Sequence, residues 1–473
     1  MRIVLSFFAL YYAKLAKKFH NREMRVHFIA IGGSVMHNLA IALRNQGHTV
    51  TGSDDEIFDP ALSRLREAGL LPAQTGWDAT RIHPELDAIL LGMHARADNP
   101  ELLKARELGL RIYSFPEFIY EQTRHKKRVV IGGSHGKTTI TSMIMHVLQH
   151  AGLPFDYMVG AAVEGFPLQI RLSETAPIAI LEGDEYPDSA IHKTPKFHLY
   201  KPDIGLLSGI AWDHVNVFPT FNGYVDQFRQ FMAMIPPNGK LFFAESDPEL
   251  QQLTREFGDP ARFLPYRALP AVVRHGQTFL LYQNQEIAVP VFGEHNRTNL
   301  GGALLVLKEL GVTEAQFYAA IPGFKGAARR LELLAEKPDA AIYRDFAHSP
   351  SKLKATIHAV KEQYPGRHLL SVMELHTFSS LSSNFLSEYK DSMKEADEAV
   401  VFYNPHALAL KKLPALDPEQ VRRDFNDPQL RILHTAPELW EYLAARNYRN
   451  SNLLLMSSGH FDGADLNLIK TLL

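Results

Sequence analysis

Short strand-like runs of apolar residues alternate with helix-like segments along most of the chain. The first run, Val26–Ile31, leads into Gly32 and Gly33, and a helix is expected from about Val35 to Gln46. Such alternation is typical of parallel sheets that carry helices on both faces. The pattern therefore predicts an α/β fold.

The alternating segments fall into three units, each with its own strands. A length of 473 residues favours three domains, since a domain holds roughly 150 residues. We predict domains at 24–124, 125–329 and 330–473, with a hinge at Pro322–Gly326. The expected strands are Val26–Ile31, His48–Thr51, Ala88–Leu91 and Arg111–Tyr113 in the first unit, Arg128–Ile131, Ile178–Leu181, Ile204–Ser208, Lys240–Phe243 and Phe279–Tyr282 in the second, and Ala340–Tyr343, His368–Met373, Ala399–Phe402 and Asn452–Met456 in the third.

Composition narrows the class of protein. Hydrophobic residues make up 46% and charged residues 22% of the chain, as in ordinary soluble globular proteins. The 50 basic and 52 acidic side chains give a net charge of −2, so no basic excess points to a nucleic-acid partner. The chain has no cysteine, which excludes disulfides, thiolate zinc sites and cysteine nucleophiles. Any metal must be held by oxygen or imidazole ligands.

The first 23 residues stand apart from this pattern. Ile3–Ala13 is apolar, and Lys14, Lys17 and Lys18 follow it. One interpretation is a short signal or membrane-surface segment, but the run is too short to span a bilayer, and a signal peptide carries its basic residues before the apolar run. We favour a translation start placed too early, with the first domain beginning at Met24. We expect no membrane partner.

A glycine loop after the strand Arg128–Ile131 opens a helix, which is the setting of a phosphate-binding P-loop. Glycines let backbone N–H groups turn toward phosphate oxygens, and the helix N-terminus favours anions. We expect Lys137 to be a solvent-facing charge that neutralises phosphate, and Thr138 to ligate Mg²⁺. Ile131 stands where the full motif has its first glycine, so the loop is a variant. The candidate nucleotide-binding residues are Gly133, Ser134, His135, Gly136, Lys137, Thr138 and Thr139.

Two polar clusters follow later strands of the same unit. Glu182–Glu185 comes directly after an apolar strand, where a carboxylate can reach a magnesium ion held by Thr138. The alternative is an acidic, solvated turn. Asp213 and His214 come after the strand Ile204–Ser208, and a neutral imidazole could ligate a second metal. A hydrogen-bonded loop histidine is the default interpretation of His214.

Three further segments are weaker candidates. Asn296 and Asn299 share one helical face, with His295 beside them, and could bind a purine edge or cap the helix. Arg330 could cover the phosphates, and Asp345 could hold ribose hydroxyls. In the first unit, a diphosphate could sit on the helix after the first strand. The residues proposed for it are Gly32, Gly33, Ser34, Ser53 and Asp54.

A nicotinamide dehydrogenase fits poorly. Its fingerprint, G-x-G-x-x-G, would place glycines at Ala30, Gly32 and Val35, and only one is present. A P-loop regulatory switch remains a non-enzyme alternative, but it would need neither the first-unit motif nor Asp345–Pro350.

Taken together, the motifs resemble the Mur ligase family of peptidoglycan enzymes from Met24 to the C-terminus. The loop Gly133–Thr139 looks like the family's T-G-T-H-G-K-T-T, with Gly132 and Ser134 as departures. The other matching segments are Glu182–Tyr186 (E-A-D-E), Asp213–His214 (D-H), His295–Asn299 (H-N-x-x-N), Phe324–Glu332 (F-x-G-x-x-R-R-x-E) and Asp345–Pro350 (D-[YF]-A-H-x-P).

The resemblance implies a three-domain ligase that uses ATP and Mg²⁺. The implied domains are a Rossmann-like UDP-binding domain, a central P-loop ATPase with a parallel sheet, and a Rossmann-like C-terminal domain that holds the amine. ATP would phosphorylate a carboxylate, and an amine would attack the acyl phosphate. We expect a cytoplasmic location, because such an enzyme belongs where ATP is. The implied catalytic residues are Lys137, His214, Arg330 and His348, the metal ligands are Thr138, Glu182 and His214, and ATP would also contact His295, Asn296, Asn299, Arg330 and Asp345.

Phe28–Gly33 together with Gly52–Asp54 resembles the family members that take UDP-N-acetylmuramate. Two groups of the family do so. One adds L-alanine, and the other adds a recycled murein peptide, L-alanyl-γ-D-glutamyl-diaminopimelate. Glu182–Tyr186, Lys196–Pro202 and Leu455–Gly463 look like the second group. The last segment departs from the expected S-N-G-G-F-G-G, and the L-alanine ligase stays the alternative.

Overall fold

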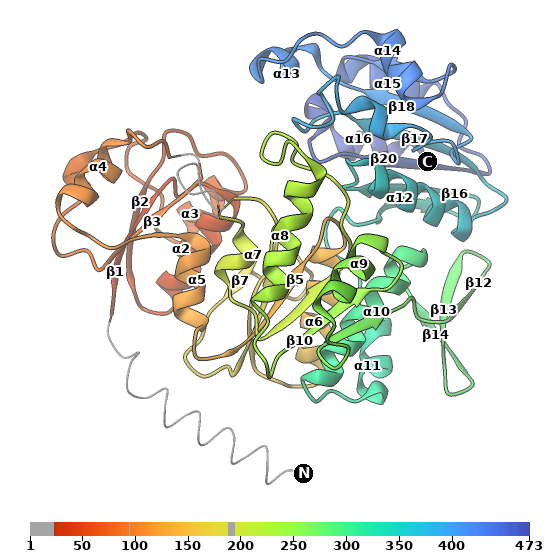
Figure 1. The fold of residues 1–473 in the computed structure, drawn as a ribbon. Helices are drawn as coiled ribbons and strands as arrows, with labels where there is room; N and C mark the ends of the chain where they lie inside the picture. The colour runs from red at the N-terminus through yellow and green to blue at the C-terminus, as the bar shows by residue number, and fades with distance from the viewer. Residues whose placement is uncertain (1–22, 94, 188–193) are drawn as a thin grey trace.

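The computed structural model describes residues 23–93, 95–187 and 194–473. The chain forms an α/β protein whose sheets follow one another along the sequence, from the red and orange N-terminal domain to the blue C-terminal domain in Figure 1. The expectation for residues 1–23 concerns a segment that, apart from Glu23, lies outside the described residues.

The N-terminal domain contains a four-stranded parallel sheet in the order β2-β1-β3-β4. Its core strand β1 is buried from Val26 onward, because helices cover both faces of the sheet. The elements are β1 (Arg25–Ile29), α2 (Ser34–Asn45), β2 (Thr49–Ser53), α3 (Ala61–Glu67), η1 (Ala79–Arg81), β3 (Ala88–Leu91), α4 (Pro100–Glu107), β4 (Ile112–Ser114) and α5 (Phe115–Thr123).

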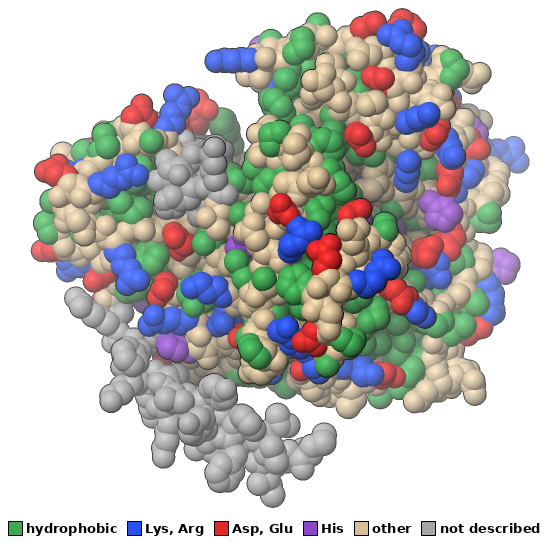
Figure 2. All heavy atoms as spheres, viewed as in Figure 1, with side chains coloured by type: hydrophobic (Ala, Val, Ile, Leu, Met, Phe, Trp, Pro, Cys, Tyr) green, Lys and Arg blue, Asp and Glu red, His purple; other side chains and the backbone are tan. Residues whose placement is uncertain are grey.

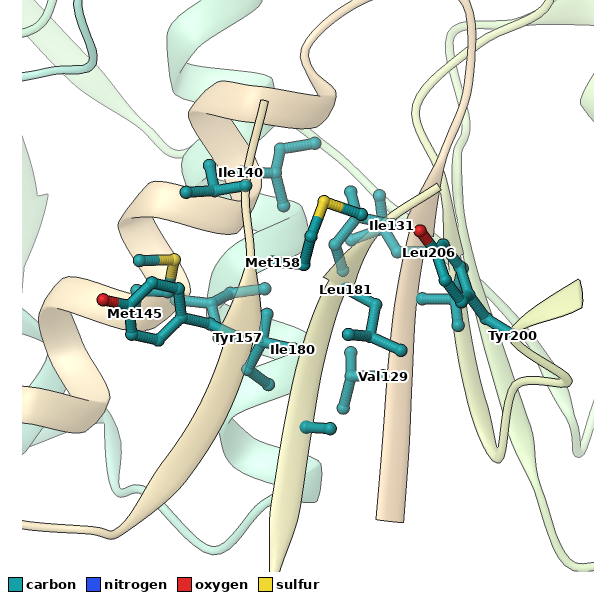
Figure 3. Packing of buried hydrophobic residues seen from close by; sticks show 14 of the residues in the cluster. Val129, Ile131, Ile140, Met145, Tyr157, Met158, Ile180, Leu181, Tyr200 and Leu206 are labelled. Carbon is teal, nitrogen blue, oxygen red and sulfur yellow. The ribbon is translucent and has the colours of Figure 1, made fainter. Parts of the chain in front are cut away.

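The central domain has a seven-stranded sheet in the order β11-β10-β9-β5-β8-β6-β7, parallel except for β7. The middle strand β5 carries the glycine loop, and Figure 3 shows Ile131 from its end packed in one apolar cluster with Ile140 of the following helix. The elements are β5 (Lys127–Gly132), α6 (Lys137–His150), β6 (Phe155–Met158), β7 (Ile170–Arg171), β8 (Ile178–Glu182), α7 (Lys196–Leu199), β9 (Ile204–Leu207), α8 (Phe221–Ala233), β10 (Lys240–Ala244), α9 (Pro248–Phe257), β11 (Phe263–Tyr266), α10 (Glu294–Glu309), α11 (Glu314–Ala320) and η2 (Ile321–Gly323).

A small antiparallel sheet interrupts the central domain. It consists of β12 (Ala271–Arg274), β13 (Gln277–Tyr282) and β14 (Gln285–Val289). The sequence pattern predicted only part of the middle strand, because the outer strands are half exposed and carry few buried apolar residues.

The C-terminal domain has a six-stranded sheet in the order β15-β16-β20-β17-β18-β19, parallel except for the edge strand β15. Its predicted strands are present with ends shifted by one or two residues. The elements are β15 (Glu332–Lys337), β16 (Ala340–Asp345), α12 (Pro350–Gln363), β17 (His368–Glu374), η3 (Leu386–Tyr389), β18 (Glu398–Phe402), α13 (Pro405–Leu410), α14 (Pro418–Phe425), β19 (Arg431–Leu433), α15 (Ala436–Ala444), β20 (Ser451–Met456), η4 (Phe461–Gly463), α16 (Leu466–Ile469) and η5 (Lys470–Leu472).

Phe292, just before α10, belongs to the central domain in sequence but to the C-terminal core in space. It is buried in the same apolar cluster as Tyr343 and Ala359, and its ring meets the Tyr343 ring edge-on at 5.4 Å. Trp212 makes a second apolar contact between the domains, with the Phe385 ring 6.1 Å away. The C-terminal domain therefore packs directly against the central one.

The surface is of mixed charge. Acidic and basic side chains are interspersed over the face drawn in Figure 2, in keeping with the net charge of −2. Within the described residues, no helix has both the length and the apolar character needed to span a bilayer.

Candidate functional site

The loop between β5 and α6 has the backbone of a phosphate cradle. Gly133 and Gly136 adopt φ values of +125° and +75°, which L-residues with side chains rarely adopt. A Cβ on Gly136 would lie 2.6 Å from Asn299 Oδ1, and one on Gly133 would collide with Ser208. Ser134 anchors the loop, because its hydroxyl lies 2.7 Å from Tyr224 Oη, outside the loop. Both glycines are therefore required by geometry.

Lys137, the first residue of α6, is largely buried, which corrects the expectation of a solvent-facing charge. Its Nζ donates to Glu185 Oε2 at 2.7 Å and to the Gly133 carbonyl at 2.7 Å, with Asp184 Oδ1 at 3.8 Å. Burial opposes its charge, but the Glu185 and Asp184 carboxylates outweigh burial and raise the pKa of Lys137. The lysine is held charged and folded back onto the loop.

Thr138 and Glu182 come together at the start of α6 and the end of β8. Thr138 Oγ1 donates to Glu182 Oε1 at 2.7 Å, and the Gly160 N–H donates to Glu182 Oε2 at 2.7 Å. Burial, followed by the neighbouring Asp184 charge, raises the pKa of Glu182. Thr139, in the same turn, is buried.

The Thr138 and Glu182 oxygens fit a magnesium ion bound to a nucleotide. Such an ion takes only one or two protein oxygens, and phosphate oxygens and waters complete its shell. Among the described residues, no group of three histidine, aspartate or glutamate side chains could hold a metal by itself. The chemistry of the site therefore suits a metal that arrives with phosphates.

His214 lies against the Glu185 carboxylate. Its Nε2 is 3.7 Å from Glu185 Oε1, and its ring lies 4.7 Å from the Tyr186 ring. Its backbone is left-handed, with φ of +55°, and its N–H donates to the Asp213 carboxylate. The structure thus places His214 beside the Lys137 counter-ion, while Glu182 binds Thr138.

An ion pair that the sequence motifs do not predict, and that is largely buried, completes the acidic segment. Lys196 Nζ lies 3.0 Å from Asp184 Oδ2 and 4.0 Å from the centre of the Tyr186 ring. Asp184 is therefore bound from both sides, by Lys196 and Lys137. Burial favours its neutral form, but the two ammonium groups hold the pKa of Asp184 well below its usual range.

The start of α10 packs onto the P-loop. Asn299 lies against Gly136 and donates to Asn296 Oδ1 at 3.3 Å, while Asn296 donates to the Phe292 carbonyl. His295 and His135 are both partly buried, and this burial lowers the pKa of each to about 4. Both imidazoles are therefore neutral near pH 7.

The C-terminal domain reaches over the loop. Arg330 donates to Thr138 Oγ1 at 3.2 Å, and its guanidinium lies 4.7 Å from the centre of the Phe346 ring. His348 Nε2 is 3.4 Å from Asp213 Oδ2 in the central domain. Asp345 accepts the N–H groups of Leu331 and Ala347, each at 2.7 Å, so both of its oxygens are engaged within its own domain.

The N-terminal glycine turn is built differently. Gly32 N–H donates to Asp54 Oδ2 at 2.7 Å, Gly33 precedes α2, and Ser34 begins that helix. Ser53, in β2, donates to the buried Glu101. Burial raises the pKa of Asp54 to about 6. The Asp54 carboxylate thus accepts a hydrogen bond from the backbone N–H of Gly32, at the place where the diphosphate is expected to bind.

Basic side chains gather at the carboxyl ends of β17 and β20. Arg329 contacts His460 Nδ1 at 2.9 Å, and His376 Nδ1 lies 3.7 Å from Glu374 Oε1. Glu374 also accepts from Ser457 and from the Phe461 N–H. We call Arg329, His376 and His460 the basic cluster. Sequence reasoning noted the segment around His460 but not this grouping.

Three family models match consecutive parts of the chain. The "Mur ligase family, catalytic domain" covers residues 25–127, the "Mur ligase middle domain" covers 131–307, and the "Mur ligase, glutamate ligase domain" covers 329–459. The chain belongs to the Mur ligase family. As a Mur ligase, it is an ATP-dependent enzyme that forms an amide C–N bond.

Curated relatives of this Mur ligase include two kinds of enzyme. The chain is 27% identical over 399 residues to the Escherichia coli UDP-N-acetylmuramate–L-alanyl-γ-D-glutamyl-meso-2,6-diaminoheptandioate ligase, covering 81% of this chain and 86% of that protein. It is 30% identical over 387 residues to the Caldicellulosiruptor bescii UDP-N-acetylmuramate–L-alanine ligase, with 79% and 82% covered. Because these two identities are similar, they do not distinguish a peptide from L-alanine as the amine substrate.

A solved structure shares the fold of this Mur ligase. The murein peptide ligase of Psychrobacter arcticus superposes with a TM-score of 0.66 at 23% identity, over 95% of this chain and 98% of that one. At this identity the likeness concerns the fold, which confirms the predicted three-domain α/β architecture. The boundaries at 124/125 and 329/330 stay a prediction.

Proposed function

We propose that this Mur ligase joins the lactyl carboxylate of UDP-N-acetylmuramate to the free amine of a murein peptide that begins with L-alanine. A carboxylate oxygen attacks the γ-phosphorus of ATP, an O–P bond forms, and the bond to ADP breaks. The neutral amine then attacks the acyl carbon, the C–N bond forms, and phosphate departs. The amine proton passes to solvent.

The phosphate chemistry rests on the loop and its charges. Lys137, with backbone N–H groups at the start of α6, would bind the β- and γ-phosphates, and Arg330 would add charge from the C-terminal domain. Thr138 and Glu182 would hold Mg²⁺, which neutralises phosphoryl charge when bound. For His214 and His348 we propose catalytic roles at the boundary between the domains. The proposed nucleotide site consists of Gly133–Thr139, His295, Asn296, Asn299 and Asp345.

The UDP-sugar would bind the N-terminal turn. Gly32, Gly33 and Ser34 offer backbone N–H groups at the start of α2, a helix of 12 residues, where an anion is favoured. Ser53 ends the adjoining strand β2, and Asp54 follows it. Binding of the diphosphate would require the Asp54 carboxyl to release the Gly32 N–H.

The basic cluster is the observation that carries the choice of a peptide over free L-alanine. Arg329 directly precedes Arg330, which contacts the P-loop, and His460 lies beyond the end of β20. Arginine and histidine donors suit carboxylates. A murein peptide carries several carboxylates, whereas L-alanine has one. The cluster therefore supports the larger, more acidic amine substrate.

The test compares kcat/KM for L-alanine and for L-alanyl-γ-D-glutamyl-diaminopimelate at the same UDP-sugar concentration and saturating ATP. We expect the peptide to be preferred by at least about tenfold, equivalent to about 1.4 kcal/mol in transition-state binding. Arg329→Met should reduce that preference, while Arg449→Met, an exposed arginine of the same domain, should not. Equal use of the two amines, or a preference for L-alanine, would assign the enzyme to the L-alanine-adding group.

A further inference from the structure

Lys352 brings an additional positive charge from the C-terminal domain to the phosphate site. It lies in the first turn of α12 and belongs to none of the motifs that identify the family. Its Nζ is 3.4 Å from His348 Nε2 and 3.7 Å from Asp213 Oδ2, and its side chain is only 20% exposed. The ammonium thus lies largely shielded from solvent at the junction of two domains.

The surroundings of Lys352 are those of the P-loop. The charges that act on it are Asp213 and Glu185, which favour the ammonium, and Lys137 and Arg330, which oppose it. It also acts on the partly buried His135 of the loop. The contacts place all three cations around the P-loop. Lys352 contacts Asp213, whose neighbour His214 contacts Glu185, the counter-ion of Lys137. Arg330 contacts Thr138 of the loop.

The Lys352 ammonium has unused bonding capacity. It has three N–H donors, and its two contacts within the described part of the chain exceed the 2.7–2.9 Å usual for charge-assisted hydrogen bonds. Asp213 Oδ2, which faces it, has no hydrogen-bond partner of good geometry among those residues. A buried ammonium with unmet donors is costly. An anionic ligand entering between the domains would supply the missing oxygens.

We infer that Lys352 Nζ binds an oxygen of the phosphoryl group during its transfer from ATP to the carboxylate. The inference rests on the proposed function and adds a residue to it. Lys352 keeps its protons throughout, and its charge offsets the negative charge shared among the phosphoryl oxygens. A carboxylate of the amine substrate is the competing ligand. The phosphoryl group is favoured because Lys352 contacts Asp213, whose neighbour His214 lies beside Glu185, the counter-ion of the P-loop lysine.

The experiment measures phosphoryl transfer without any amine. Enzyme in excess over labelled ATP, with UDP-N-acetylmuramate and Mg²⁺, is quenched over time, and the formation of ADP in a single turnover is followed. Lys352→Met should slow this step by about 10²-fold, the usual loss for one preorganised donor. Lys352→Arg, which keeps the charge, should recover a large part of the rate. Lys354→Met, an exposed lysine on the same helix, should match the wild type.

Steady-state measurements separate the two ligands. A phosphoryl contact predicts that Lys352→Met lowers kcat while the KM for the amine stays within about twofold. Wild-type ADP formation together with a raised amine KM would overturn the inference in favour of a substrate carboxylate. Unchanged rates and KM values would reduce Lys352 to a structural ion pair.

Two controls keep the outcomes distinct. If Lys352→Met does not fold, the Asp213→Asn/Lys352→Met pair removes both charges, and the charge-retaining Lys352→Arg still reports on the step. The single turnover contains no amine, so a wrong amine assignment leaves its result intact. A wild-type enzyme that forms no ADP with UDP-N-acetylmuramate would overturn the proposed function, and this inference with it.

Discussion

The chain contains two strand–glycine–helix turns that suit phosphate groups, and they differ in how charge is arranged. In the central domain, Gly136 precedes α6 in a left-handed conformation, and Lys137 is buried among carboxylates. In the N-terminal domain, Gly33 precedes α2 with an extended backbone, and the charged side chain at the turn is the Asp54 carboxyl.

The difference separates stabilisation of a reacting phosphoryl group from simple binding of a diphosphate. A transferring phosphoryl group gains from preorganised positive charge, and the central turn holds that charge in place before the ligand arrives. A diphosphate that only has to be bound needs backbone N–H groups and a helix N-terminus. The same local fold thus serves two tasks, and the side chains around it decide which.

The largest effect should come from Lys137→Met. Removing one preorganised charge from the transition state should lower kcat by about 10² to 10³, or about 3–4 kcal/mol. The protein should also be less stable by about 3–5 kcal/mol, because buried Glu185 loses its counter-ion. Phosphate release and urea unfolding measure the two effects.

The double variant Lys137→Met/Glu185→Gln separates these losses. It removes both charges of the pair, so it should regain most of the stability but none of the rate. Recovery of turnover in the double variant, or a fully active single variant, would contradict the role given to the central turn.

Substituting the two glycines should reveal the difference in backbone. Gly136→Ala should destabilise the protein by about 1–2 kcal/mol or more, because alanine is strained at φ of +75° and its Cβ would crowd Asn299. Gly33→Ala should be near neutral, because φ of −55° suits any residue and the nearest obstacle is the flexible Met36 side chain at 3.3 Å. Denaturant midpoints of the two variants test this, and equal losses would contradict the contrast.

The smallest effect concerns Asp54→Asn and depends on pH. Burial raises the pKa of Asp54 to about 6, above an ordinary unfolded value of about 3.9. The folded state therefore binds the proton more tightly, and wild-type stability falls as pH rises from about 4 to about 6. Asparagine avoids this penalty and can still accept from Gly32. The variant should melt a few degrees higher at pH 8.

The advantage of Asp54→Asn should shrink toward pH 4, where the wild-type carboxyl is protonated. Glu56→Gln, which removes an exposed carboxylate two residues away, should melt like the wild type at both pH values. An advantage for Asp54→Asn that is independent of pH would show that its charge is not the cause.

The fold and the P-loop were predictable because their signals are local. Buried parallel strands appear as continuous apolar runs, and the strand, Gly133–Gly136 and the α6 helix lie within a few residues of one another. Several strands outside this rule were missed, β6, β7, β11 and β12 among them. β7 has only two residues and β12 is half exposed, so both leave little apolar pattern. The short strands β6 and β11 are each interrupted by a residue untypical of strands, Asp156 and Pro265.

Side-chain partners across the fold were not predictable in the same way. Lys137 and Glu185 are 48 residues apart, and only the pairing of β5 with β8 brings their segments together. In the sequence, nothing distinguishes Lys352 from the lysines that lie exposed on the surface. Its low exposure depends on the contact between two domains. A pattern read along one helix carries no information about such contacts.

The placement of Phe292 has a consequence for excising the C-terminal domain. A fragment 330–473 would lack this ring and leave Tyr343 and Ala359 uncovered, with an apolar socket open to water. Such a fragment should self-associate through the socket. A soluble fragment would need a polar substitution at Tyr343 or Ala359, or the short segment that carries Phe292 attached to it. The ring therefore makes the C-terminal domain dependent on residues that precede it by almost forty positions.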